Sequence, residues 1–340
     1  MPKEEELVLK KRRNGSDPIW IISMKITEHI AQSKDTLFSF EILPPLKGQR
    51  IEDIYEVIDP LMEFDPPFIN VTYHREEVVY KRLPNGLLEQ KTVRKRPGTV
   101  GICAALQYRY KVDTVPHMLC GGFSKEDTEN ALIDLDFLGV ENVLALRGDS
   151  MKNERFFAPE ADGHQYAKDL VGQIKDMNEG RFLDDELQNT NKTNFCIGVA
   201  AYPEKHFEAP SLNQDIMHLK QKVDAGADFI ITQLFFDNQK YFDFVNRCRK
   251  AGITVPIIPG LKPLSTKQHL SFLPHFFKVD LPDDLVKAVV DCKDNAAARQ
   301  VGIEWGIKQA QELKAAGVPA IHFYSMGRPD NIAAIARATF

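Results

Sequence analysis

The chain has 340 residues, of which 43% are hydrophobic and 27% charged, a composition typical of a globular protein large enough to be an enzyme. Its 43 Lys and Arg residues against 48 Asp and Glu residues give a net charge of -5, which offers no reason to expect nucleic acid as a partner. No run approaches the ~18 apolar residues of a membrane helix, and five cysteines without a Cys-x-x-Cys pair exclude a disulfide framework and a cysteine zinc site and favour the cytoplasm.

Residues 1–23 are predicted to form a disordered extension outside the folded domain. A basic cluster at 10–13 is followed by only four apolar residues, 19–22, whereas the apolar core of a secretory signal has roughly 7–15. Met24 opens a stretch with helical spacing of apolar residues, and we interpret it as the natural start. One domain is therefore expected over residues 24–340.

From residue 37 onward, short β-branched runs alternate with longer amphipathic runs. The runs predicted as strands are 37–43, 68–73, 99–105, 142–146, 195–201, 228–235, 255–259 and 320–325. The runs predicted as helices are 51–64, 125–138, 163–177, 212–225, 239–251 and a long stretch over 283–315.

This alternation indicates parallel strands joined by crossover helices. About eight such units in roughly 315 residues fit a (β/α)8 barrel of the TIM type, an α/β fold of ~250 residues plus insertions. A doubly wound open sheet is the alternative, but no Gly-x-Gly-x-x-Gly follows the first strand. We therefore favour the barrel.

Two insertions are expected in this barrel. Residues 74–97 flank Pro84-Asn85-Gly86 with β-branched runs, which predicts a β-hairpin with a tight turn. Residues 178–193 form a polar stretch that we interpret as an inserted loop.

Polar residues gather where the predicted strands end, and barrel enzymes place their chemistry at the carboxyl ends of the strands. They are Glu41, Thr72, Tyr202, Gln233 and Tyr324, with Arg147-Gly148-Asp149 directly after the fourth strand. Each has an ordinary explanation by itself, such as a solvated acid for Glu41 or a turn cap for Asp149. Five strand ends that share this feature favour a functional site.

The first strand indicates how one of these residues is aimed. Because side chains alternate along a strand, Phe38, Phe40 and Ile42 should face the helices. Ser39 and Glu41 should then point into the barrel. A carboxylate inside the rim is poorly explained by stability, which favours a chemical role.

The helix predicted at 212–225 carries a second polar group. Asp215, His218 and Lys222 share one face at spacings of three and seven residues, apart from the apolar stripe. A solvated helix face is the ordinary explanation, and a ligand-binding face is the alternative.

Eight strings in chain order resemble the flavin-dependent methylenetetrahydrofolate reductases of the short bacterial type. They are FSFEILPP (38–45), INVTY (69–73), PHMLC (116–120), LALRGD (144–149), VAAYPEKH (199–206), KQKVDAGADFIITQLFFD (220–237), IIPGLKP (257–263) and IHFYSMGR (321–328). An Arg-Gly-Asp triplet means little alone, but eight strings in order at barrel strand ends are specific. They continue to the end of the sequence, so we expect no regulatory extension of the eukaryotic kind.

The resemblance implies a (β/α)8 barrel that holds FAD without a Rossmann fold. NADH or NADPH would reduce the flavin and leave, and 5,10-methylenetetrahydrofolate would then bind the same face. Its reduction to 5-methyltetrahydrofolate belongs to one-carbon metabolism and methionine supply. A cytoplasmic homo-oligomer without a metal, a membrane or a nucleic-acid partner is expected.

The resemblance also assigns residues. Glu41 would be the general acid at N10 of the folate, and Asp149 would stand beside the flavin and the pterin. FAD would contact Thr72, Tyr73, His117, Arg147, Gly148, Asp149, Ala167, Tyr202, His206, Asp215, His218 and Lys222. The shared folate and nicotinamide surface would comprise Gln233, Gln268, Phe272, Tyr324 and Arg328.

The sequence departs from the family pattern in two places. His218 and Gln221 stand where Asn and a basic residue are usual, which leaves Lys222 with more of the phosphate charge. His74-Arg75 stand where Gly-Ala is usual, and they open the 74–97 insertion, which carries seven Lys and Arg against three Glu. This insertion either closes over the site and grips the nucleotide or the folate tail, or forms a basic flap or subunit contact.

Two other functions stay open. The chain could be a barrel-shaped binding protein without turnover, because a fold alone does not prove catalysis. The presence of both Glu41 and Asp149 argues against this, since a binder needs neither. Another barrel flavoenzyme, such as a relative of proline dehydrogenase, would be separated by a folate-dependent reoxidation assay.

Overall fold

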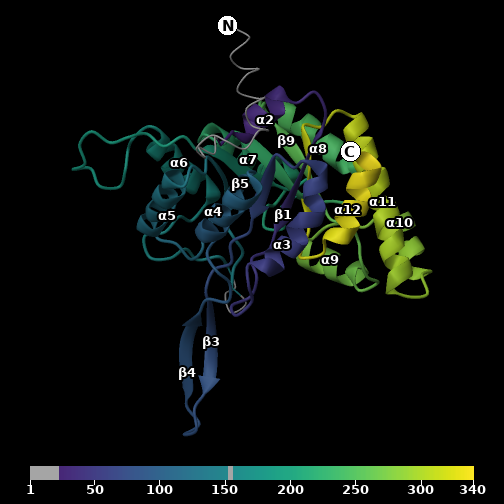
Figure 1. Cartoon of the computed structure of the whole chain (residues 1–340), viewed down its shortest axis with the longest axis horizontal. Helices are drawn as coiled ribbons and strands as arrows, with labels where there is room; N and C mark the ends of the chain where they lie inside the picture. The colour runs from purple at the N-terminus through teal and green to yellow at the C-terminus, as the bar shows by residue number, and fades with distance from the viewer. Residues whose placement is uncertain (1–22, 152–155) are drawn as a thin grey trace.

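A closed barrel of eight parallel strands, ringed by helices, forms the body of the molecule in a computed structural model that describes residues 23–151 and 156–340 (Figure 1). The predicted (β/α)8 barrel is therefore confirmed, while the extension predicted over residues 1–23 lies, except for Ser23, outside the described residues. Neighbouring strands follow the order β1-β10-β9-β8-β7-β6-β5-β2. The barrel strands are β1 (Leu37–Ile42), β2 (Phe68–Val71), β5 (Asp113–Leu119), β6 (Asn142–Leu146), β7 (Cys196–Ala201), β8 (Phe229–Leu234), β9 (Ile257–Leu261) and β10 (Ala320–Tyr324).

Helices follow or precede the strands around the outside of the barrel. They are α2 (Ile26–Gln32), α3 (Glu52–Ile58) with a 3-10 turn η1 (Asp59–Phe64), α4 (Thr99–Tyr110), α5 (Lys125–Phe137), α6 (Ala167–Asn178), α7 (Leu212–Asp224), α8 (Asn238–Lys250), α9 (His269–Phe277), α10 (Asp283–Val290), α11 (Asn295–Ala315) and α12 (Pro329–Thr339). Within the described residues, no helix is long and apolar enough to cross a membrane.

The third predicted strand, 99–105, is wrong, because these residues begin helix α4. Their β-branched composition favours a strand, but Ile102, Cys103 and Leu106 are buried at helical spacing against the barrel. The true third strand is β5, which the prediction missed. Pro116 and buried polar side chains conceal its pattern.

The helical stretch predicted over 283–315 is two helices, α10 and α11. Asp294 separates them, because its side chain accepts a hydrogen bond from the Ala297 backbone and caps the start of α11. The remaining predicted helices coincide with α3–η1, α5, α6, α7 and α8, with shifts of a few residues at their ends.

Side chains of β1 alternate as expected. Phe38, Phe40 and Ile42 are buried in the main apolar core together with residues of the surrounding helices. Ser39 faces inward, where its hydroxyl lies 3.0 Å from Nδ1 of His322 on β10. The side chain of Glu41, two residues further along β1, therefore points into the barrel at the carboxyl ends of the strands.

Helix α2 closes the amino end of the barrel. Ile26 is fully buried among inward-facing residues of several strands, and its backbone N–H donates to Oδ1 of Asn142 over 2.8 Å. The Asp113 carboxylate accepts from the Ser23 hydroxyl over 2.8 Å, and its Oδ2 lies 2.6 Å from Nε2 of His29. Helix α2 thus blocks this end and leaves the carboxyl ends of the strands as the accessible mouth.

A two-stranded antiparallel hairpin, β3 (Glu77–Arg82) and β4 (Leu88–Val93), projects from the barrel (Figure 1). Its turn contains Gly86 at a φ of +83°, a backbone conformation that glycine adopts without strain. Its base is tied to the β1–α3 loop, where the Lys47 N–H donates to Lys95 O and the Arg96 guanidinium donates to Pro44 O. The insertion therefore begins and ends at the mouth of the barrel.

Candidate active site

Glu41 is the central titratable group at the mouth. Its side chain is 16% exposed, and its Oε2 lies 3.5 Å from Nε2 of His117 on β5. Burial raises the pKa of Glu41 to about 8, opposed by the positive charge of Lys262. Burial also lowers the pKa of His117 to about 3, so this contact joins two uncharged groups at neutral pH. Glu41 is therefore a carboxylic acid that can donate a proton.

Polar side chains lie in the barrel beside Glu41, where Asn70 is opposite it in the β1–β2 ladder, and beneath it, where Ser39 is opposite His322. Nδ2 of Asn70 is 3.5 Å from Nε2 of His117, while Ser39 pairs with Nδ1 of His322. Within the described chain, the buried Asn70 Oδ1 and His322 Nε2 have no hydrogen-bond partner. Leaving such an atom unpaired costs ~1–3 kcal/mol, so stability alone does not account for these side chains.

Tyr324 ends β10 beside Glu41, with which it is paired in the β1–β10 ladder. Its hydroxyl donates to the Thr232 carbonyl oxygen over 2.6 Å, which lays the ring across β9. A Cβ at Gly260 would lie 2.7 Å from that ring and 2.2 Å from Thr232 O. Glycine is therefore required at position 260 for the observed placement of Tyr324.

The Gly260→Ala variant is expected to lose roughly 1–3 kcal/mol of stability because its methyl group overlaps backbone and ring atoms. The matched control is Gly101→Ala in α4, where no atom lies within 4 Å of the added Cβ. Alanine should raise stability there by about 0.5–1 kcal/mol. Urea denaturation measures both changes, and an unchanged midpoint for Gly260→Ala would contradict the close approach.

A cationic group forms on the other side of the mouth, between the ends of β6 and β7 and helix α7. Nη1 of Arg147 lies 2.6 Å from Oε2 of Glu208. The Lys222 ammonium donates to the Ala200 carbonyl over 2.6 Å, and burial lowers the pKa of Lys222 to about 8, with Asp215 opposing and Arg147 adding to this decrease. Two neighbouring cations of this kind are suited to a multiply charged anion.

His206, Asp215 and Tyr202 complete this cationic group. Oδ2 of Asp215 accepts a hydrogen bond from the backbone N–H of His206 over 2.8 Å. The His206 ring lies edge-on to the Tyr202 ring, with 4.7 Å between their centroids. Burial, reinforced by Asp149 and Asp215, raises the pKa of Tyr202 well above its usual range, so its hydroxyl stays protonated. The strand-end residues and one face of helix α7, predicted separately, therefore meet.

The other residues assigned to FAD stand directly after β2 and β6 or on helices α6 and α7. Oγ1 of Thr72 is 3.4 Å from Nε2 of His74, and the Tyr73 and Phe123 rings are 4.8 Å apart. Gly148 has a φ of +84°. Ala167 is the first residue of α6. Within the described chain, the exposed His218 side chain hydrogen bonds only to Gln214, over 3.2 Å.

The residues assigned to folate and nicotinamide belong to β8, β10 and α9 or stand directly before α9 and α12. Oε1 of Gln233 accepts from the Leu234 N–H over 2.9 Å. Gln268 directly precedes α9, and the exposed Phe272 ring stacks on Phe276 at 5.4 Å. Arg328 directly precedes α12. No hydrogen bond among the described residues joins Gln268 or Arg328 to Glu41.

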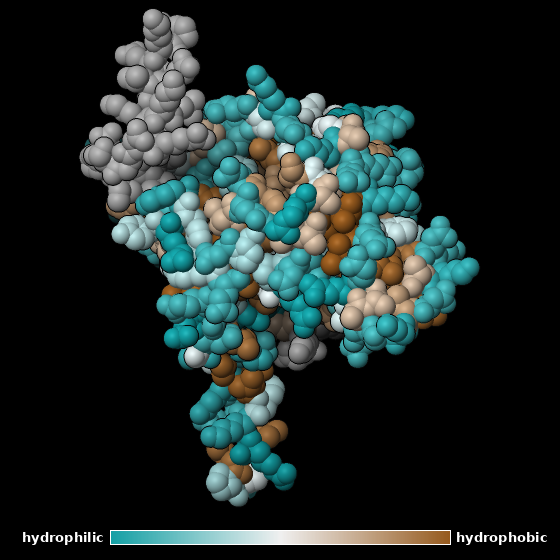
Figure 2. All heavy atoms as spheres, turned by 45° about the vertical axis from the view of Figure 1, so that its right-hand side comes forward, coloured by the Kyte–Doolittle hydropathy of each residue, from teal (hydrophilic) through white to brown (hydrophobic). Residues whose placement is uncertain are grey.

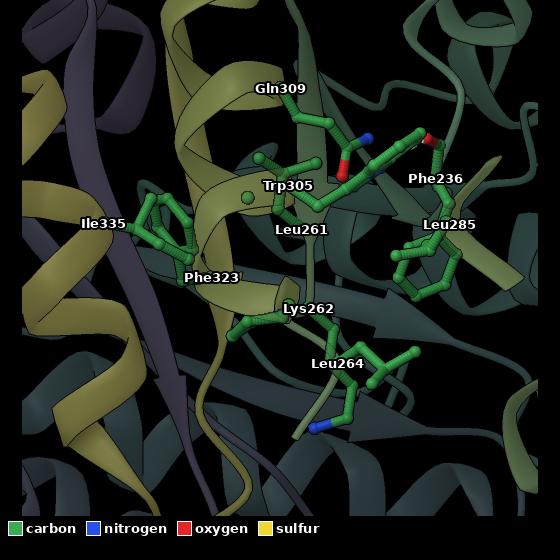
Figure 3. Close-up of a pocket in the computed structure, with 12 residues that line it drawn as sticks. Phe236, Leu261, Lys262, Leu264, Leu285, Trp305, Gln309, Phe323 and Ile335 are labelled. Carbon is green, nitrogen blue, oxygen red and sulfur yellow. Dashed lines mark hydrogen bonds between the residues drawn. The ribbon is translucent and has the colours of Figure 1, made fainter. Parts of the chain in front are cut away.

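Lys262 and His269 were missed as site residues by the sequence reasoning. Lys262 follows β9 directly, a strand-end position like that of the predicted residues, so the same rule could have found it. Its side chain lines a small cavity beside α11, but its ammonium points away from Trp305 and Gln309 (Figure 3). Burial, with Lys262 and Arg328 adding, lowers the pKa of His269 to about 4. The cavity itself is mainly apolar and belongs to the core.

Comparisons with known proteins show the family of the chain. A family model described as methylenetetrahydrofolate reductase matches residues 25–339. Methylenetetrahydrofolate reductase (NADH) 1 from Zea mays is 32% identical over 316 residues, which cover 89% of this chain and 48% of that protein. The 5,10-methylenetetrahydrofolate reductase of Salmonella typhimurium is 30% identical over 295 residues, and the alignment covers 86% of this chain and 86% of that protein. The chain thus spans about half the length of the plant relative and most of the bacterial one.

Among solved structures, an uncharacterized protein from Clostridium thermocellum that binds two copies of 5-methyl-5,6,7,8-tetrahydrofolic acid aligns with a TM-score of 0.54. It is 15% identical, and the alignment covers 92% of this chain and 98% of that one. At this identity the likeness concerns the fold alone.

Proposed function

The chain belongs to the methylenetetrahydrofolate reductase family, and from this premise we propose that it reduces 5,10-methylenetetrahydrofolate to 5-methyltetrahydrofolate. NADH or NADPH is the reductant and FAD carries the hydride between the two substrates. The observation that carries the proposal is the largely buried carboxyl of Glu41, which lies beside His117 at the mouth of the barrel. The reaction belongs to one-carbon metabolism and methionine supply in the cytoplasm.

Glu41 supplies the proton that this reduction needs. Opening the five-membered ring of the substrate requires a proton on N10, and an acid whose pKa lies near the working pH donates it efficiently. Burial raises the pKa of Glu41 to about 8 and so keeps its carboxyl protonated at neutral pH. Tyr324 and Gln233, together with Gln268, Phe272 and Arg328 near α9 and α12, bind the folate and, in the other half-reaction, the nicotinamide.

The chemistry of the cationic group fits FAD. Arg147 and Lys222 are neighbouring cations whose charges match a pyrophosphate, and the partner that Arg147 now has is the exposed carboxylate of Glu208. The positive φ of Gly148 lets the backbone approach a ligand closely, and Asp149 follows it at the mouth. When bound, FAD supplies hydride acceptance from the nucleotide and hydride donation to the folate.

The contacts proposed for the rest of FAD surround this cationic group. They come from Thr72, Tyr73, His117, Ala167, Tyr202, His206, Asp215 and His218. Purified protein should carry about one FAD per chain, seen as flavin absorption. Addition of methylenetetrahydrofolate should reoxidise the NAD(P)H-reduced flavin. Colourless protein that fails to take up FAD would contradict the proposal, and a reduced flavin that does not respond to folate would favour another flavoenzyme.

We further propose that the protein is a homo-oligomer and that the β3–β4 hairpin is its subunit contact. One hairpin face presents Val78, Tyr80 and Leu88, the last two 59% and 65% exposed, and hydrophobic surface appears on the hairpin in Figure 2. A lone two-stranded hairpin is marginally stable in water, so this face needs cover. Residues 74–97 carry a net charge of +4 in a chain of -5, which leaves -9 elsewhere and suits a second copy of the chain.

The double variant Tyr80→Ser/Leu88→Ser is expected to dissociate the oligomer into monomers, measured as molar mass by light scattering. The reason is the loss of two apolar contacts from the proposed interface. Leu187→Ser is the matched control, because Leu187 is 52% exposed in the loop after α6 and outside the hairpin. A monomeric parent protein, or equal dissociation in the control, would contradict the proposed contact.

A further inference from the structure

Lys262 is a buried cation at the mouth of the barrel that the proposed reaction has not used. The β10–β9 ladder pairs His322 with Gly260 and Phe323 with Leu261, and Tyr324 and Lys262 are the next residues of the two segments. In the β1–β10 ladder the same Tyr324 is opposite Glu41. Because alternate residues share a face, Glu41, Tyr324 and Lys262 all point into the barrel at the same height.

The Lys262 side chain is held there without a conventional partner. The residue is 8% exposed, and across residues 23–151 and 156–340 no hydrogen bond or ion pair reaches its ammonium. Buried lysines are normally paired, so this arrangement is costly for stability alone. Burial lowers the pKa of Lys262 to about 8, while the Glu41 charge opposes this decrease and Arg328 adds to it.

We propose that Lys262 is a positioning residue for proton transfer, whose ammonium stabilises the carboxylate that Glu41 becomes after it protonates the folate. This inference rests on the proposed function. In the step, the O–H bond of Glu41 breaks and an N10–H bond forms. The bond from N10 to the one-carbon unit breaks with its electron pair going to N10. The cation left on the one-carbon unit takes the hydride, and Glu41 regains its proton from water.

The other titratable groups that face Glu41 are uncharged, so they cannot stabilise its carboxylate as the Lys262 ammonium can. His117 faces Glu41 from β5 and is neutral, because burial lowers its pKa to about 3. Tyr324 faces it from β10 and is also neutral, because burial and Glu41 raise its pKa. Arg328 before α12 acts on Lys262 and lowers its pKa, while His269 on α9 is neutral, because burial, with Lys262 and Arg328 adding, lowers its pKa to about 4. Among the described residues, Lys262 is thus the cation whose charge acts on Glu41.

The test is the pH dependence of the folate half-reaction, measured by rapid mixing of FAD-loaded, reduced enzyme with methylenetetrahydrofolate. Lys262→Met removes the charge that lowers the pKa of Glu41, so Glu41 stays protonated to higher pH. The alkaline limb of the rate profile should move up by about one pH unit or more. The plateau rate should fall about tenfold, because a weaker acid donates its proton more slowly. Lys262→Arg keeps the charge and should retain both the limb and most of the rate.

Reduction of the flavin by NAD(P)H is the internal control, because it needs no proton from Glu41. A slower folate step with an unmoved alkaline limb would overturn the inference and make Lys262 a packing residue. Lys262→Gln is neutral but polar, so it must shift the alkaline limb of the rate profile as Lys262→Met does. It serves as the test variant if the Lys262→Met protein is unstable. A parent enzyme without folate-dependent reoxidation would instead contradict the proposed function.

Discussion

Glu41→Gln is expected to abolish the folate half-reaction and to leave flavin reduction nearly intact. Glutamine keeps the shape and hydrogen-bonding capacity of the acid but cannot give a proton to N10. Folate-dependent reoxidation should fall by ~10²–10⁴, typical of a lost general acid, while reduction by NAD(P)H stays within about tenfold of the parent rate. Both half-reactions are measured by rapid mixing on one preparation.

The parent enzyme provides a second measurement of the same residue. Because burial raises the pKa of Glu41 to about 8, the folate half-reaction should proceed below that pH and decline as the pH rises through it. This alkaline limb should be absent in Glu41→Gln. Equal losses in both half-reactions would indicate damage to the flavin site, and small losses in both would make Glu41 an ordinary strand-end acid.

Lys222→Ala is expected to weaken FAD binding by roughly 10- to 150-fold. The substitution removes one charge-assisted contact with a phosphate, which contributes about 1.5–3 kcal/mol. Titration of apoprotein with FAD, followed by quenching of flavin fluorescence, gives the dissociation constant. Without this ammonium, purified protein should also lose much of its yellow colour.

The control for this variant lies two residues away on the same helix. Lys220 forms an exposed ion pair with Asp224, one turn further along α7. Such pairs contribute little, so Lys220→Ala should leave the FAD dissociation constant and the melting temperature almost unchanged. If both variants bind FAD equally well, the partly buried Lys222 is a structural cation and the pyrophosphate lies elsewhere.

The barrel was predictable because its parallel strands and amphipathic helices alternate with distinct periods, and seven of the eight predicted strands coincide with observed ones. The remaining predicted strand shows where local sequence composition fails to predict secondary structure. Residues 99–105 have the composition of a strand, but packing of Ile102 and Leu106 against the barrel stabilises a helix there. β5 was missed because it carries three buried polar side chains, Asp113, Thr114 and His117, which break the apolar pattern of a strand.

The candidate site was predictable where the alternation of side chains along a strand decides which way a residue points. Alternation along β1 placed Glu41 inside the barrel before its surroundings were known. No sequence pattern predicts that burial would bring its pKa to about 8, because that value depends on β5, β9 and β10 meeting around it. Lys262 was missed for a simpler reason: the predicted strand ended at residue 259, whereas β9 continues to Leu261, so the strand-end rule was applied two residues too early.

The closure of the barrel floor by α2 sets an order for folding during synthesis. Met24 and His29 reach Asp113, 89 and 84 residues further along the chain, and the Ile26 N–H reaches Asn142, 116 residues away. At a ribosomal rate of ~5–20 residues per second, α2 therefore waits on the order of ten seconds for Asn142 alone, and longer for Cys196 on β7, which lies against Thr27. Until the strands of the barrel floor have been made, Ile26 has no core to enter, so the nascent chain leaves Ile26 and Ile30 exposed and accessible to a chaperone.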